Sequence, residues 1–233
     1  MIFMLYTSFQ ERFLSECIAI SNVPGIFADS YFVAGSAALI LILTAVLAVL
    51  ITRRYLSSRQ VQYAFWSIGL WLFAFGVLLE VLFAIGLYGS AMADAYFLSV
   101  ALLVEFLAMG SISMTKSRSA KYAYAAYSAL AGAAVLYSLM SSHLGDVVVN
   151  HVVFGVLPLS VVASSSAATF PAAVVLIALA ARSYMRRRSS KMLSIIAGVV
   201  VVSIAGTLYI AEFPAFLYYS EFIGILLLWL GFI

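Results

Sequence analysis

The chain has 233 residues, of which 66% are hydrophobic and only 9% are charged, and it carries a net charge of +3. Soluble domains contain about 25% charged residues, so this composition excludes an ordinary soluble domain and indicates an integral membrane protein. The single cysteine excludes an internal disulfide framework and any metal cluster built on cysteines. We expect a multi-pass protein of the cell membrane that needs no cofactor and binds no nucleic acid.

Seven segments of the chain are apolar enough and long enough to cross the hydrocarbon core, which takes about 20 residues. They cover residues 31–52, 61–87, 93–114, 122–141, 160–181, 192–212 and 214–233. The predicted fold class is therefore an all-α integral membrane protein, with a seven-transmembrane-helix bundle over residues 31–233.

The basic residues set the predicted orientation of this bundle. Every lysine and arginine except Arg12 falls in the three loops that follow the first, third and fifth segments. The opposite loops hold acidic residues and both histidines, without lysine or arginine. Because loops rich in lysine and arginine stay in the cytoplasm, we predict that the N-terminus is outside and the C-terminus is cytoplasmic.

Two further elements are expected on the outer side. Residues 1–30 lack the basic start and the cleavage site of a signal peptide, and their apolar residues recur at three- and four-residue steps. They predict an interfacial amphipathic helix, which either caps the bundle or closes over it as a lid. In "DVVVNHVVFGV" (146–156), branched residues on both sides of Asn150 and His151 predict a β-hairpin within about 143–157.

A short internal repeat relates the two halves of the chain. In residues 53–76 and 182–206, a tyrosine and a basic loop precede two glycines that are seven or eight residues apart. The matched pairs are Tyr55 with Tyr184, Gly69 with Gly198, and Gly76 with Gly206. The pattern predicts two parallel repeats, over about 31–114 and 160–233, joined by a linking helix at about 122–141 in a 3+1+3 plan. The alternative is that the match is a coincidence, because a mostly apolar chain uses few residue types. The glycines themselves favour close helix packing over a hinge.

Three glutamates lie inside predicted spans that contain no lysine, arginine or histidine: Glu80, Glu105 and Glu221. An isolated carboxylate is costly in hydrocarbon, so each must be neutral, bound to a cation or exposed to a wet cavity. Acidic residues within a membrane point to function. We interpret these three as a proton- or cation-binding set that opens outward, with Glu105 deepest. The alternative is that each is a hydrogen-bonding strut between helices.

The fifth span offers polar partners for these carboxyl groups. Its hydroxyl-bearing residues include Ser164, Ser165 and Thr169, and they precede Pro171. A proline within a helix frees the carbonyl four residues earlier, which is that of Ala167, and can kink the helix. These hydroxyls either line a polar pocket or serve as small residues at a helix contact.

Other candidate chemistry is weaker. His143, Asp146 and His151 in the outer loop could supply a metal site, although their spacing matches no compact motif. No phosphate-binding loop, zinc-protease pair or nucleophile elbow is present. We therefore expect that the protein is not an enzyme.

The segment "DAYFLSVALLVEF" (94–106) resembles the third helix of microbial rhodopsins. Its two acidic residues, Asp94 and Glu105, have the same eleven-residue separation as two acidic residues of that helix. Such a resemblance would imply a retinal-binding lysine in the last span. Residues 214–233 contain no lysine, which removes that interpretation. The 3+1+3 plan also resembles that of the SWEET sugar transporters, but the paired Pro-Gln motifs of the related families are missing.

The predicted function is the binding or transport of a small solute, a proton or a cation through the buried carboxyl groups. An alternative is a non-catalytic scaffold subunit of a larger membrane complex. A second alternative is a seven-helix sensor that signals to a separate cytoplasmic partner. The expected partners are the lipid bilayer and, for a scaffold, other membrane subunits or further copies of the chain.

Overall fold

The computed structural model describes residues 30–87, 89–142, 148–149, 152–153, 157–187, 194, 197–198, 201 and 214–232. These residues form six helices and one short hairpin. The helices are α2 (Ser30–Ser58), α3 (Val61–Ala84), α4 (Ser90–Ser113), α5 (Arg118–Ser141), α6 (Leu159–Arg187) and α8 (Pro214–Phe232). The hairpin consists of β1 (Val148–Val149) and β2 (Val152–Val153).

Helices α2 to α6 are each long and apolar enough to cross a membrane, and α8 contains a shorter apolar stretch. The chain is thus an all-helical bundle of the kind found in multi-pass membrane proteins. Six of the seven predicted spans, all except the one at 192–212, coincide with these helices. The predicted span at 192–212 and the predicted amphipathic helix at 1–30 lie almost entirely outside the described residues.

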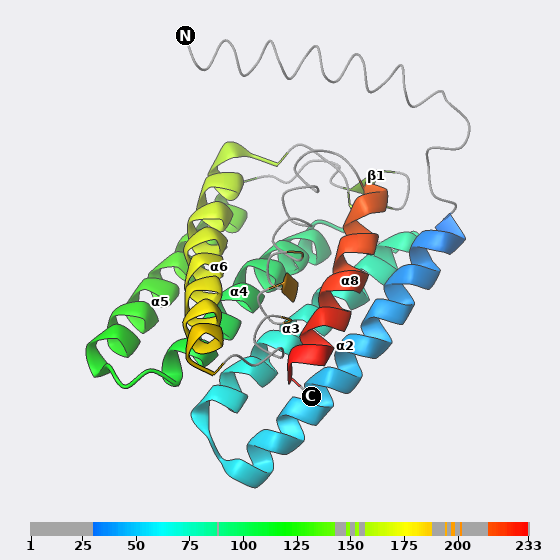
Figure 1. The fold of residues 1–233 in the computed structure, drawn as a ribbon. Helices are drawn as coiled ribbons and strands as arrows, with labels where there is room; N and C mark the ends of the chain where they lie inside the picture. The colour runs from blue at the N-terminus through cyan, green and yellow to red at the C-terminus, as the bar shows by residue number, and fades with distance from the viewer. Residues whose placement is uncertain are drawn as a thin grey trace.

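The described helices form two outer pairs with two helices between them. Figure 1 shows α5 and α6 side by side, α2 beside α8, and α3 and α4 between these two pairs. The connections from α2 to α3 and from α4 to α5 lie at the same end of the bundle as the C-terminal end of α6. The basic residues at this end include Arg53, Arg54, Arg59, Lys116, Arg118, Lys121 and Arg182.

The hairpin lies at the opposite end of the bundle, where β2 contacts α3. Its strands are antiparallel, with Val148 opposite Val153 and Val149 opposite Val152. These two strands lie within the segment predicted as a hairpin, about 143–157.

Glycines bring α3 and α4 into close contact. A Cβ atom at Gly69 would lie 3.1 Å from the carbonyl oxygen of Leu103, and one at Gly76 would lie 3.2 Å from Ser99 Oγ. Gly198 similarly faces α8, where an added Cβ would lie 3.2 Å from the carbonyl oxygen of Gly224. Small residues permit such approach where lipid supplies no hydrophobic drive, so these contacts confirm the packing role predicted for the glycines.

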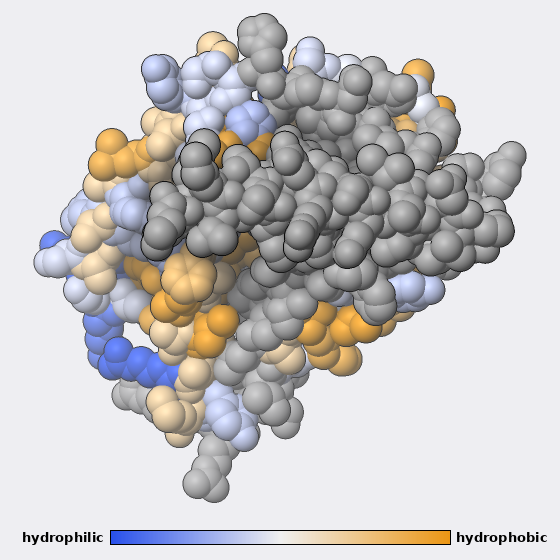
Figure 2. All heavy atoms as spheres, turned by 90° about the horizontal axis from the view of Figure 1, so that it is seen from above, coloured by the Kyte–Doolittle hydropathy of each residue, from blue (hydrophilic) through white to orange (hydrophobic). Residues whose placement is uncertain are grey.

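The outward faces of the helices are strongly apolar. On α5, Leu130, Tyr137 and Met140 are 73%, 75% and 81% exposed. Viewed from above, apolar side chains reach the surface on several sides of the described bundle (Figure 2). In water such a surface would drive aggregation, whereas in a bilayer it faces a solvent of the same polarity.

Candidate functional site

Two of the predicted glutamates meet in the half of the bundle nearer the hairpin. Glu80 lies near the C-terminal end of α3 and Glu221 lies in the first half of α8, and they are only 2% and 7% exposed. Their carboxyl groups lie close enough to interact directly. Tyr96 of α4, itself buried, donates a hydrogen bond from its hydroxyl to Glu80 Oε1 at 2.7 Å. We call Glu80, Tyr96 and Glu221 the carboxyl pair site.

Aromatic packing fixes the tyrosine of this site. The Tyr96 ring makes edge-to-face contacts with Phe83 at 6.0 Å and with Phe97 at 5.3 Å between ring centroids. Phe83 follows Glu80 by three residues, so both lie on the face of α3 that packs against α4. The side chains that bury Glu80 therefore also aim its hydrogen-bond donor at it.

The carboxyl pair site can hold a proton or a small cation. When both groups are ionised, the Oε2 atoms of Glu80 and Glu221 have no hydrogen-bond donor among the described residues. The described lysines and arginines lie at the other end of the bundle. A proton on one group would let it donate to the other, and a bound cation would satisfy both. Two bare buried charges in contact would cost far more than either arrangement.

Glu105 belongs to a different cluster, at the interface of α4 with α5. It is 1% exposed, and its Oε2 accepts a hydrogen bond from the Tyr124 hydroxyl at 2.9 Å. Ser128, one helical turn beyond Tyr124, lies close to this carboxyl group. Oε1 of Glu105 has no donor within the part of the chain that the structure describes.

Helix geometry explains why Glu105 does not reach the carboxyl pair site. It follows Tyr96 by nine residues on α4, which is about 2.5 turns and about 13.5 Å along the axis. The extra half turn places Tyr96 and Glu105 on opposite faces of α4. One face contacts α3, and the other contacts α5. The structure thus brings together two of the three predicted glutamates.

The predicted hydroxyls of α6 mostly bond within their own helix. Ser164 Oγ donates to the carbonyl oxygen of Val161 at 3.1 Å, and Thr169 Oγ1 donates to that of Ser165 at 2.9 Å. Ser165 is partly buried. None of the hydrogen bonds described for these three side chains joins them to a carboxyl group.

The freed carbonyl of α6 has found a partner on another helix. The Tyr127 hydroxyl of α5 donates a hydrogen bond to the carbonyl oxygen of Ala167, the acceptor that Pro171 leaves without its usual amide. The ring of Tyr127 also contacts that of Tyr124, with centroids 6.0 Å apart. Tyr124 and Tyr127 therefore connect the Glu105 cluster to the proline of α6.

The tyrosines at these sites escaped the sequence-based selection of site residues, which considered charged groups and small hydroxyls. A tyrosine in the middle of an apolar helix is a detectable signal, because its hydroxyl usually finds a partner when buried. The candidate metal ligands His143, Asp146 and His151 lie outside the described residues. Among the residues that are described, no three His, Cys, Asp or Glu side chains come together.

Comparison with known proteins adds no relative from which a role could be transferred. No protein-family model, no curated protein and no solved structure matches this chain.

Proposed function

We propose that the protein is a seven-helix membrane protein of the cell membrane that binds a proton or a small cation at the carboxyl pair site as part of solute or ion transport. The proposal places the N-terminus outside and the basic loops in the cytoplasm, with 3+1+3 repeats around a linking helix α5. The observation that carries it is the contact between two buried carboxyl groups, Glu80 and Glu221, contributed by helices far apart in the sequence.

Contact between these two acids favours a binding role over a purely structural one. A single buried carboxyl group can serve as a hydrogen-bonding strut between helices, and Glu105, which accepts a hydrogen bond from Tyr124, fits that simpler role. Two carboxyl groups in contact form a site whose charge changes with each proton or cation gained or lost. The Tyr96 hydroxyl stabilises the charged form of Glu80, because it donates to that carboxyl group.

In the proposed orientation, the carboxyl pair site lies in the outer half of the membrane. Glu80 is four residues from the end of α3, which is about 6 Å along the helix axis. Glu221 is seven residues from the start of α8, or about 10 Å. Both distances are short compared with a hydrocarbon core of about 30 Å. A proton or cation would therefore enter from the outside.

The test is proton and sodium uptake by purified protein in liposomes, measured with entrapped fluorescent indicators. Glu80→Gln and Glu221→Gln keep the side-chain size but remove the charge, and each should lower uptake about tenfold, equivalent to one charged hydrogen bond. Asp94→Asn is the control. It removes an acidic side chain near the N-terminal end of α4, at the same end of the bundle as the carboxyl pair site but outside the pair. Uptake that is unchanged in both glutamine variants would refute the proposal.

Glu105→Gln decides whether the deeper carboxyl group takes part. Uptake unchanged in this variant, together with losses at Glu80 and Glu221, identifies the pair alone as the site. A loss as large as that of Glu221→Gln would extend the site to the second cluster.

A scaffold subunit is the second candidate function. It is favoured by the outer face of α5, where large apolar side chains are exposed on a helix that packs mainly against α4 and α6 among the described helices. The test is the size of the particle purified from native membranes in mild detergent. A scaffold predicts co-purifying subunits that are lost when Leu130 and Met140 are replaced by serine, whereas a monodisperse monomer excludes it.

A further inference from the structure

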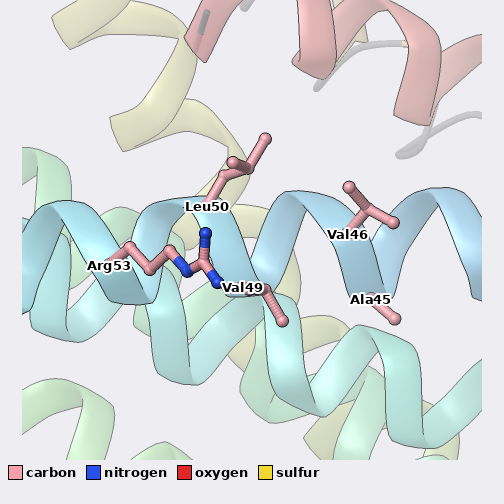
Figure 3. Close-up of a pocket in the computed structure, with 5 residues that line it drawn as sticks. All are labelled: Ala45, Val46, Val49, Leu50 and Arg53. Atoms are coloured by element: carbon pink, nitrogen blue, oxygen red, sulfur yellow. The ribbon is translucent and has the colours of Figure 1, made fainter.

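We propose that an apolar groove on the outer face of α2 binds one anionic phospholipid, with an acyl chain along the groove and the lipid phosphate on Arg53. The groove is shallow and largely open, has a volume of about 300 Å³ and is lined by Ala45, Val46, Val49, Leu50 and Arg53 of α2 (Figure 3). This inference is independent of the carboxyl pair site.

The lining residues combine two chemistries along one helix face. Ala45 to Leu50 provide only hydrocarbon, and Val46, Val49 and Leu50 are 44%, 38% and 38% exposed. From Ala45 to Arg53 the groove follows α2 for eight residues, or about 12 Å. That length suits the upper part of an acyl chain directly below its headgroup.

The direction of Arg53 sets the position of the phosphate. In Figure 3 its side chain runs back along α2, so that the guanidinium lies beside Val49 and Leu50 at one end of the groove. This is the direction expected on a helix, where side chains lean toward the N-terminus. The cation therefore lies at the boundary between the apolar groove and the basic end of the bundle.

The protein itself supplies no anion for this cation among the described residues. The acidic residues among those that the structure describes are Glu80, Asp94, Glu105 and Glu221. Three of them lie toward the hairpin end, and Glu105 is buried against α5. The neighbouring Arg54 is different, because it donates to the carbonyl oxygen of Phe232 at 3.0 Å and lies over the Tyr63 ring.

A guanidinium at the edge of hydrocarbon is complementary to a phosphate that carries an acyl chain. It can bind phosphate through two parallel hydrogen bonds, and a basic residue near an anionic membrane surface contributes about 1 kcal/mol. A zwitterionic lipid would place its own cation beside Arg53, so the arrangement favours a headgroup with net negative charge.

The test measures lipid retained by the full chain after extraction from nanodiscs of phosphatidylglycerol and phosphatidylcholine, by native mass spectrometry. The wild-type protein should retain one phosphatidylglycerol in preference to phosphatidylcholine, and Arg53→Gln should lower that preference about fivefold. Arg118→Gln is the matched control, since it removes one exposed arginine at the same end and should change nothing. Equal preference in wild type and Arg53→Gln would overturn the proposal.

A second variant tests the groove. Val46→Trp fills it with an outward-facing side chain that the fold can accommodate, and it should abolish retention while leaving Arg53 in place. Retention that survives Val46→Trp would mean that the headgroup alone binds. Displacement of the lipid by inorganic phosphate would reduce the site to a phosphate site, and an acidic protein retained in its place would identify a docking surface. Each of these three results contradicts the proposal.

Discussion

Removing the tyrosine hydroxyl of the carboxyl pair site gives the sharpest test of its geometry. Tyr96→Phe deletes one oxygen atom, which donates to Glu80 Oε1 at 2.7 Å, and keeps the ring contacts with Phe83 and Phe97. Hydrogen bonds between membrane helices contribute about 0.6 kcal/mol on average and up to about 1.7 kcal/mol. Bonds to charged groups contribute about 1.5–3 kcal/mol in soluble proteins. We expect the free energy of unfolding to fall by about 1–2 kcal/mol.

Reversible unfolding in mixed detergent micelles, followed by circular dichroism, measures this loss. Tyr137→Phe is the control, because Tyr137 is 75% exposed and its substitution should change the free energy by less than about 0.5 kcal/mol. A double-mutant cycle with Glu80→Leu should give a coupling free energy of about 1 kcal/mol between Tyr96 and Glu80. If Tyr96→Phe is no less stable than Tyr137→Phe, or the coupling is zero, the reasoning is refuted.

Two further predictions concern helix packing. An added Cβ at Gly110 would collide with the indole of Trp66, so Gly110→Ala should lower the free energy of unfolding by about 1–3 kcal/mol, whereas Gly35→Ala, with open space around it, should not lower it; equal effects of the two would contradict the packing. Tyr127→Phe should lower stability by about 1 kcal/mol by depriving the carbonyl freed by Pro171 of its donor. Added to Pro171→Ala, which restores the backbone amide, Tyr127→Phe should cost almost nothing, and an undiminished loss would show that the bond does not depend on the proline.

For the six described helices, the sequence predicted their positions well and their ends less well. The apolar runs at 31–52 and 160–181 continue as α2 to Ser58 and as α6 to Arg187. The prediction stopped where hydrophobicity fell, because it counted only the residues needed to cross the hydrocarbon. Helical hydrogen bonding carries on into the basic residues, since arginine is a good helix former. The boundary of a membrane span and the end of a helix are thus different physical quantities.

The candidate site could be predicted in its residues but not in its pairing. Glu80 and Glu221 stood out because charged groups are rare in apolar helices, yet nearly every face of these helices is apolar, so periodicity could not show which faces meet. Pro171 was more informative, since the chemistry of proline alone identified the Ala167 carbonyl as an acceptor in need of a donor. The half-turn offset between Tyr96 and Glu105 could also have been calculated once Tyr96 was recognised.

The separations of the hydrogen-bonded residues have a consequence for biogenesis. Glu80 and Tyr96 are 16 residues apart, and Glu105 and Tyr124 are 19 apart, so each carboxyl group meets its tyrosine as soon as the next helix is synthesised. Glu221 follows Glu80 by 141 residues, counted from their positions in the chain. During synthesis, Glu80 therefore lies beside Tyr96 but without Glu221 while helices α5 and α6 are inserted. Only the insertion of α8 brings Glu221 to Glu80, so a nascent chain holds Glu80 and Tyr96 together but lacks the second carboxyl group of the site until α8 enters the membrane.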